Sequence, residues 1–196
     1  MKNLLLTLLT LLIGSSSFAQ SAYLDSMKAY RTRYVDEHEV ITTPETKKGL
    51  RFFPIDEQYR VEARFEKVSD GQWFSMETSG SVRKTFRVYG MLHFQVHDTA
   101  VSMPIYQSQS IIQLEQYKDH LFLPFTDLST GESTYEVGRY IDLTTHDIKG
   151  DKVIVDFNKA YNPYCAYVSG KYNCPIPPVA NRLGVFIGAG EMSFQK

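Results

Sequence analysis

Four charged residues in the second half of the sequence are the best candidates for chemistry. Asp127, Arg139, Asp142 and Asp156 combine three carboxylates with one guanidinium. Carboxylates can transfer protons or bind polar ligands when a fold gathers them beside a cation. One hypothesis is therefore a polar site, at one end of a β structure, in which these four side chains converge. The alternative is structural, because Asp side chains commonly satisfy backbone amides in loops.

Amide and tyrosine side chains around these charges extend the candidate set. The predicted binding residues are Asp127, Arg139, Asp142, Asp156, Asn158, Tyr161, Asn162, Tyr164, Tyr167, Tyr172 and Arg182. Tyrosine joins a large apolar face to a hydroxyl, which suits sugar, peptide or protein surfaces. We expect ligand contacts to centre on the four tyrosines, with Arg139 and Arg182 as polar anchors. The alternative is that the tyrosines fill the β core.

Recognised catalytic and cofactor motifs do not occur in the sequence. There is no G-x-S-x-G nucleophile elbow, no P-loop and no pair of C-x-x-C zinc spacings. His38 and Glu39 begin a zinc-protease motif, but Thr42 stands where its second histidine would be. The sequence therefore predicts no metal site and no cofactor, assigns no catalytic residue, and leaves open whether the protein is an enzyme.

The candidate residues gather in and around the stretch from Asp156 to Leu183. It holds both cysteines, four of the 8 prolines and four of the 13 tyrosines. No helical or strand periodicity runs through it, and its aromatic content argues against disorder. We predict a long ordered loop, and loops of this length in compact domains usually serve a function.

Cys165 and Cys174 lie within this loop and are the only cysteines of the chain. In an exported protein such a pair indicates a disulfide. The chain-entropy estimate for a closed loop of ten residues is about 2.7 kcal/mol. A redox-active pair is the alternative, although such pairs are usually spaced C-x-x-C at the start of a helix.

Two stretches carry a resemblance to a known family. NPYCAY, CPIPP and NRL occur within residues 156–183, and residues 125–143 read FTDLSTGESTYEVGRYIDL. Together they resemble the domain of unknown function 1684 family of bacterial proteins, which has no assigned activity to carry over. Glu136 and Val137 precede Gly138 where that pattern has small residues, so a tight turn there is in question.

The N-terminus has the features of a secretory signal. A basic Lys2, an apolar run from Leu4 to Ile13 and a small-residue end at Ala19 predict a signal peptide over residues 1–19. We expect an exported protein, periplasmic or extracellular, with no transmembrane segment after cleavage. The formal net charge is −1 with interspersed charges, so no basic stripe indicates a nucleic-acid partner.

Periodicity predicts the elements that must position the candidate residues. Tyr23, Met27, Tyr30 and Tyr34 follow helical spacing between Ser21 and about His38. Strands are expected at 59–65, 73–78, 85–96, 101–105, 121–125, 152–157 and 183–187, the first two as a hairpin around Asp70-Gly71. Gly90, in the middle of the longest strand, predicts a bulge or a close backbone approach.

These patterns predict one mainly β domain over residues 20–196, an antiparallel barrel or sandwich with one N-terminal helix. Two classes of function fit it. The first is a binding or structural module of the cell envelope that uses the disulfide-closed, Tyr-rich loop for a glycan, a peptide or an envelope protein. The second is a hydrolase or lyase with carboxylates converging near that loop.

Overall fold

The computed structural model describes residues 20–195, so the predicted signal peptide lies outside the described residues. The described residues fall into two compact units, 20–39 and 40–195. In the first unit residues 20–36 are helical, which confirms the predicted N-terminal helix. The extent of a single domain over 20–196 stays a prediction.

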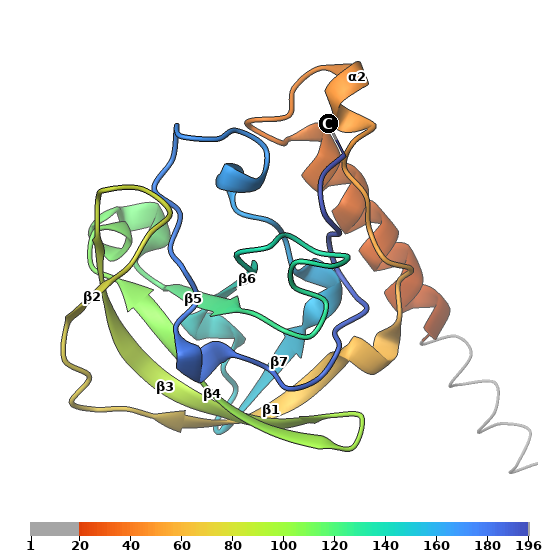
Figure 1. The fold of residues 1–196 in the computed structure, drawn as a ribbon. Coiled ribbons are helices and arrows are strands. Elements are labelled where there is room, and N and C mark those ends of the chain that lie inside the picture. Colours follow the sequence, from red (N-terminus) through yellow and green to blue (C-terminus); the bar gives the residue numbers. More distant parts are fainter. Residues whose placement is uncertain (1–19, 196) are drawn as a thin grey trace, which may run out of the picture. The chain divides into compact units, whose positions relative to one another are not determined.

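The second unit is mainly β, as predicted, and its antiparallel sheet curls into a half-barrel (Figure 1). The strands are β1 (Arg60–Lys67), β2 (Phe74–Met76), β3 (Lys84–Val96), β4 (Thr99–Ser108), β5 (His120–Phe125), β6 (Arg139–Thr144) and β7 (Lys152–Asp156). Their order is β6-β5-β4-β3-β1-β7, and β2 also pairs with β3. The short helix α2 spans Pro44–Lys47. Single 3-10 turns are η1 (Glu57–Tyr59), η2 (Ile111–Gln113), η3 (Glu115–Tyr117), η4 (Thr145–Asp147), η5 (Phe157–Lys159), η6 (Tyr164–Ala166) and η7 (Val179–Asn181).

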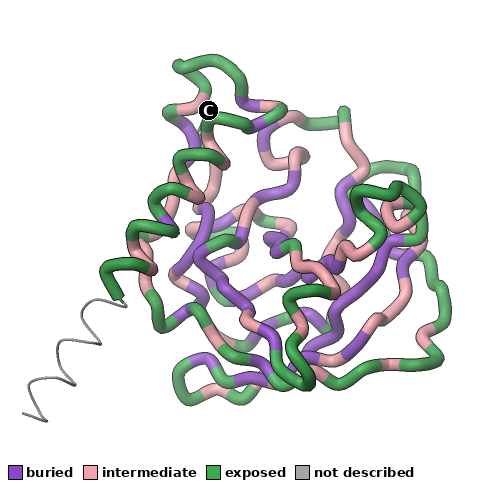
Figure 2. Tube along the Cα trace, turned by 180° about the vertical axis from the view of Figure 1, so that it is seen from behind, coloured by how far each residue is buried: buried purple, intermediate pink, exposed green. Residues whose placement is uncertain are grey.

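The sheet buries side chains on both faces around β4. Ile105 belongs to the main core, whereas its neighbour Tyr106 belongs to a second cluster with Met76, Phe86, Phe122 and Tyr140. Consecutive residues of a strand point to opposite faces, so the two clusters lie on opposite sides of the sheet. Figure 2 shows the resulting buried stretches along the strands.

Gly90 marks the place where β3 changes the face that it buries. The pairing steps from Val88 opposite Tyr106 to Gly90 opposite Ile105, which leaves one extra residue in β3. Cross-strand partners share a face, so β3 faces the second cluster before this bulge and the main core after it. A Cβ on Gly90 would lie 2.3 Å from an atom of the Phe65 ring. The predicted bulge and the predicted close approach are both confirmed.

The predicted hairpin between residues 59–65 and 73–78 is wrong. β1 and β2 both pair with β3, one after the other along the same edge, with Lys67 opposite Gly90 and Phe74 opposite Phe86. The 13 residues of β3 offer an edge long enough for both strands. A Cβ on Gly71 would lie 2.2 Å from the Val88 carbonyl oxygen. Asp70-Gly71 therefore leads the chain closely past the bulge and does not reverse it.

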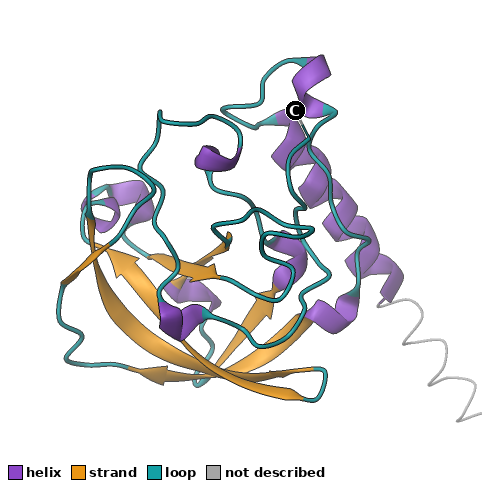
Figure 3. Ribbon diagram, viewed as in Figure 1, coloured by secondary structure: helices purple, strands orange, loops and turns teal. Residues whose placement is uncertain are grey.

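The predicted terminal strand at residues 183–187 is also wrong. That segment is buried at Leu183 and Ile187 but forms no strand, and only an isolated parallel bridge joins Thr126 to Arg182. Residues 157–195 hold no strand, as Figure 3 shows. The predicted ordered loop is confirmed, and a disulfide joins Cys165 to Cys174 within it.

We expect Gly90→Ala to lower the free energy of unfolding by about 1–3 kcal/mol, because the added methyl group would overlap Phe65 and the Glu66 carbonyl. Urea denaturation measures the change. Gly184→Ala is the matched control, since its Cβ would meet no atom within 4 Å. The control should change stability by less than about 0.5 kcal/mol. Equal losses in the two variants would contradict the packing of the bulge.

Candidate functional site

Two of the predicted site residues form a buried ion pair. Arg139, the first residue of β6, lies 3.3 Å from Asp127, which follows β5. Neither side chain is exposed to solvent, at 0% for each. Arg139 pairs with Phe125 across the strands and shares its face, so its guanidinium lies within the main core. Burial lowers the pKa of Arg139, and Asp127 opposes that shift.

The carboxylate of Asp127 is fully occupied by the protein itself. Its Oδ1 accepts hydrogen bonds from the Ser129 hydroxyl at 3.0 Å, the Thr130 hydroxyl at 3.2 Å and Arg139. Its Oδ2 accepts from the backbone amides of Ser129 at 3.2 Å and Ile187 at 2.8 Å. Five donors exceed the roughly four lone-pair sites of a carboxylate, so none is left for a substrate proton.

Arg139 also takes the place of a partner strand for the C-terminal segment. Its guanidinium donates to the carbonyl oxygens of Ile187 at 3.1 Å, Ala189, and Glu191 at 3.2 Å. One side chain thus satisfies every second carbonyl of residues 187–191. In a β-sheet the backbone amides of a neighbouring strand would do this. The carbonyls that Arg139 reaches are therefore satisfied without a partner strand, while Leu183 and Val185 bond the backbone of Thr126 and Leu128.

A second buried network lies next to the ion pair and was missed by sequence reasoning. Glu191, with 0% exposure, accepts a hydrogen bond from the Tyr167 hydroxyl at 2.7 Å and another from the Asn162 amide at 2.8 Å. The Asn162 side chain donates to the Met192 carbonyl at 2.8 Å. One signal was present in the sequence, since an acidic residue inside an apolar terminal segment must find partners when it is buried.

Asp142 lies away from Arg139, although the two belong to the same strand. They are three residues apart on β6 and therefore point to opposite faces of the sheet. Asp142 accepts from the Tyr161 hydroxyl at 2.7 Å and lies 2.9 Å from His120 Nε2. His120 was not among the predicted residues. This trio fastens the start of the loop to β5 and β6, because Tyr161 also forms a backbone bridge with Tyr140.

Asp156 lies in a third place, at the end of β7 on the opposite edge of the sheet order from β6. It caps η5 by accepting from the Asn158 amide at 3.0 Å. The Asn158 side chain in turn accepts from the Asp56 amide at 3.0 Å and donates to the Asp56 carbonyl at 2.7 Å. The structure therefore joins Asp127 to Arg139 and distributes Asp142 and Asp156 elsewhere.

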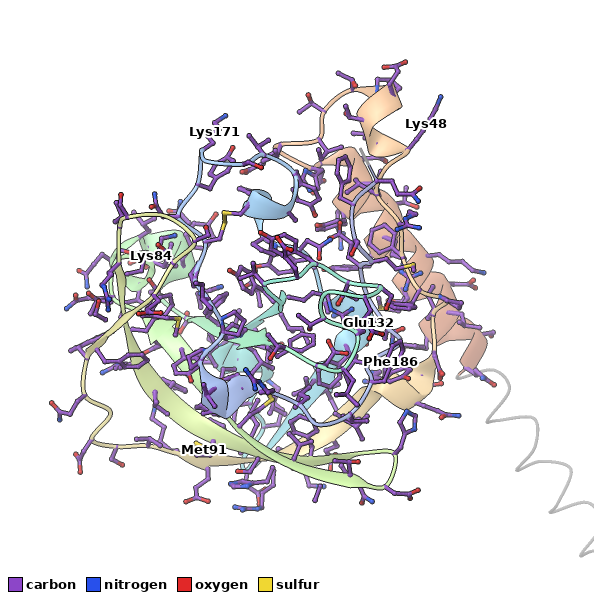
Figure 4. All side chains as sticks on the ribbon, viewed as in Figure 1. Lys48, Lys84, Met91, Glu132, Lys171 and Phe186 are labelled. Atoms are coloured by element: carbon purple, nitrogen blue, oxygen red, sulfur yellow. A yellow bond between two sulfur atoms is a disulfide. The ribbon has the colours of Figure 1, made fainter. Side chains whose placement is uncertain are left out.

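The four tyrosines of the loop differ in exposure. Tyr167 is buried, while Tyr161, Tyr164 and Tyr172 are half-buried. The rings of Tyr164 and Tyr172 meet edge to face at 5.2 Å beside the disulfide, and the Lys171 ammonium lies 5.3 Å from the Tyr172 ring. Figure 4 shows Lys171 at the outer tip of this loop. We call Tyr164, Lys171 and Tyr172 the loop surface.

The disulfide loop rests on the segment between β2 and β3. Ser79 donates its amide to the Cys174 carbonyl at 2.9 Å, and its hydroxyl accepts from the Cys174 amide at 3.1 Å. The Ile176 amide donates to the Glu77 carbonyl at 2.9 Å. Farther along, Asn181 accepts from the Tyr106 hydroxyl at 2.7 Å. The loop thus covers the second cluster.

Arg182 lines a surface pocket of about 440 Å³. Its other walls include Thr126, Leu128, Thr130, Glu136 and Leu183, and the buried Asp127 also contributes. Glu136 belongs to a turn closed by a 3.1 Å bond from the Gly138 amide to the Tyr135 carbonyl, with Gly138 at φ +112°. The tight turn that the sequence left in question is therefore formed.

Residues 20–195 offer neither a metal-binding cluster nor a membrane-spanning helix. No cluster of three or more histidine, cysteine or carboxylate side chains in this range could hold a metal ion. Within the same residues no helix is both long enough and apolar enough to span a bilayer. Neither result assigns a partner to the protein.

We expect Arg139→Met to lower the free energy of unfolding by about 3–5 kcal/mol, because it leaves the buried Asp127 charge unpaired. Guanidinium denaturation, read by far-UV circular dichroism, measures the loss. Arg87→Met is the control, since Arg87 is only partly buried and bonds Gln107 at 2.6 Å and 3.1 Å. An Arg139 variant no less stable than the Arg87 variant would show that the ion pair does not hold the C-terminal segment.

Comparisons with known proteins agree with this architecture. An uncharacterized protein of Haloarcula marismortui, solved by NMR in solution, is similar with a TM-score of 0.65 and 29% sequence identity. The match covers 91% of this chain and 96% of that chain. None of the curated proteins matches the sequence. A family model described as protein of unknown function (DUF1684) matches residues 45–192, about three quarters of the chain. The chain therefore belongs to the DUF1684 family.

Proposed function

We propose that the protein is a non-catalytic binding module, exported to the cell envelope, that contacts its partner through the loop surface of Tyr164, Lys171 and Tyr172. The observation that carries this proposal is the use of the ionisable side chains. Asp127 accepts five hydrogen bonds inside the fold and has no capacity for acid-base work. The residues most suited to catalysis by type are therefore engaged in structure.

His120 supports the same proposal. Its Nε2 is bonded to Asp142, and its Nδ1 is buried without a hydrogen-bond partner among the described residues. A general base needs a nitrogen within hydrogen-bond reach of the substrate. Neither ring nitrogen of His120 offers that in this structure. The contacts among His120, Asp142 and Tyr161 are better explained as a structural link that holds the start of the loop to β5 and β6.

The loop surface has the composition of a recognition site. Two tyrosine rings and a lysine combine apolar area, hydroxyl groups and a positive charge, which suits a glycan, a peptide or an envelope protein. The disulfide and the contacts with Ser79 fix this loop before any partner arrives. A fixed loop loses less conformational entropy when it binds. Arg139 and Tyr167 are buried, so direct ligand contact by either would require the loop to move.

Export is part of the proposal and has its own test. We expect cleavage after Ala19, so that the protein purified from the extracytoplasmic fraction begins at Gln20. The disulfide is compatible with this compartment, because such bonds persist in oxidising environments. Intact-mass analysis of the fractionated cells measures the N-terminus. Full-length protein with Met1 retained, recovered from the cytoplasm, would contradict export.

Binding is tested by a thermal-shift screen of the exported protein against glycans, peptidoglycan fragments and short peptides. A ligand that prefers the native state raises the transition temperature by mass action. We expect a positive shift that Tyr164→Ala and Tyr172→Ala both abolish. Tyr117→Ala is the matched control, since Tyr117 is an exposed tyrosine of η3, outside the loop. It should keep the shift.

Three results would count against the proposal. A shift that survives both loop variants contradicts the location, and no shift with any compound contradicts the proposed partner classes. Turnover of a screened compound that Asp142→Asn abolishes in a folded protein would favour the alternative, a hydrolase or lyase.

A further inference from the structure

We propose that the pocket beside Arg182 binds a small zwitterion with an apolar side chain, an aliphatic amino acid or a short peptide of such residues. The pocket is separate from the loop surface, so this inference adds a second site and does not depend on the first. It rests on the pocket's charges, on its apolar wall and on the way its walls are built.

The walls are held together by their own backbone hydrogen bonds. The Thr126 amide donates to the Asn181 carbonyl at 3.1 Å, and the Leu183 amide donates to the Thr126 carbonyl at 2.7 Å. The Leu128 amide donates to the Val185 carbonyl at 3.2 Å. The segments 126–128 and 181–185 are therefore fixed without a ligand. Most of the backbone donors and acceptors between them already bond each other. Recognition falls to the side chains that face the pocket.

Two opposite charges face the pocket without being paired to each other or to anything else in the described range. Arg182 and Glu136 both line it and are both exposed. Within residues 20–195 neither side chain forms a hydrogen bond or an ion pair. A ligand with a carboxylate and an ammonium group complements both charges at once. A simple anion would be repelled by Glu136, and a simple cation by Arg182.

The floor of the pocket adds little net charge. Asp127 contributes to the lining, but its carboxylate is neutralised by Arg139 and saturated by hydrogen bonds. It therefore does not turn the pocket into a cation site. Thr126 adds a hydroxyl group at the wall, which suits the polar end of a small ligand, whereas the Thr130 hydroxyl is already bonded to Asp127.

The apolar part of the ligand is indicated by two leucines. Leu128 is 59% exposed at the pocket, and Leu183 forms a buried part of its wall. Covering an exposed leucine with an apolar side chain removes hydrocarbon surface from water. The volume of about 440 Å³ lies within the range of small-molecule sites. An aliphatic amino acid or a dipeptide fits both the size and the composition.

Isothermal titration of the full exported protein tests the ligand class. We expect L-leucine to bind, and leucinamide and N-acetyl-leucine to bind about tenfold or more weakly, because each lacks one charged group. Leucyl-leucine separates the two sources of the ligand. Tighter binding of the dipeptide indicates a peptide ligand, and tighter binding of leucine indicates a free amino acid. No binding of leucine or leucyl-leucine at millimolar concentration would overturn the proposal.

Two single variants test the roles of the charges. With Arg182→Gln, leucine and leucinamide should bind equally, since the carboxylate has lost its partner. With Glu136→Gln, leucine and N-acetyl-leucine should bind equally, since the ammonium group has lost its partner. If the ratio of each analogue's dissociation constant to that of leucine stays at the wild-type value in both variants, the site lies elsewhere and the proposal is wrong.

Matched controls separate this site from stability effects and from the loop surface. Glu132→Gln removes an exposed carboxylate of the neighbouring turn, and Lys149→Gln removes an exposed cation far along the chain (Figure 4 labels Glu132). Neither residue lines the pocket, so both variants should keep the wild-type analogue ratios. Unchanged melting midpoints show that all four variants fold. Tyr172→Ala should also keep leucine binding, so failure of the loop proposal is distinguishable from failure here.

Discussion

One buried ion pair holds the C-terminal segment, which contains no strand, against the sheet. Arg139 begins β6, Asp127 follows β5, and both bond the C-terminal segment, the first through carbonyls and the second through the Ile187 amide. Ion pairs that lose all solvent are costly unless every remaining hydrogen-bonding position is used. Here Nη1 and Nη2 of Arg139 and both oxygens of Asp127 are bonded to protein groups, and Arg139 Nε alone lacks a partner among the described residues. Several of these partners belong to the C-terminal segment, so the pair and the segment stabilise each other.

The need to cover apolar side chains on both faces of the sheet explains the long loop. Because β3 changes face at the Gly90 bulge, the sheet exposes hydrophobic side chains on both sides, and each side needs a cover. Residues 157–160 and 183–189 supply it for the main core. The segment between them bridges the β6 edge at Tyr161 and covers the second cluster. Burial raises the pKa of the Tyr106 and Tyr140 phenols, so both stay protonated and donate to the loop.

These structural duties bear on function. The family and its structural neighbour carry no assigned activity, and a fold alone does not imply one. A binding function depends on groups that are not already engaged within the fold. Those are the half-buried aromatic pair beside the disulfide and the unpaired charges of Glu136 and Arg182. Both suit the binding that we propose, and they lie on loops fixed by the sheet, where recognition sites commonly occur.

The sequence by itself determined the class of the fold. Alternation located β1, β3 and β4, apolar runs located β5 and β7, the lack of periodicity identified the long loop, and Gly90 marked the bulge, because each of these depends on local sequence. It could also have separated Arg139 from Asp142, since an odd spacing on one strand puts two side chains on opposite faces.

Only the tertiary structure decided which segments are partners. β2 pairs with β3 and not with β1, because the long edge of β3 competes with the local turn at Asp70-Gly71. The apolar terminal segment is not a strand: Arg139 of β6 satisfies the carbonyls of Ile187 and Ala189, and Leu183 and Val185 form single backbone bonds with Thr126 and Leu128. Glu136 and Arg182, 46 positions apart, meet at one pocket through the bridge between Thr126 and Arg182. Such pairings are contacts between distant parts of the chain, and neither propensity nor spacing encodes them.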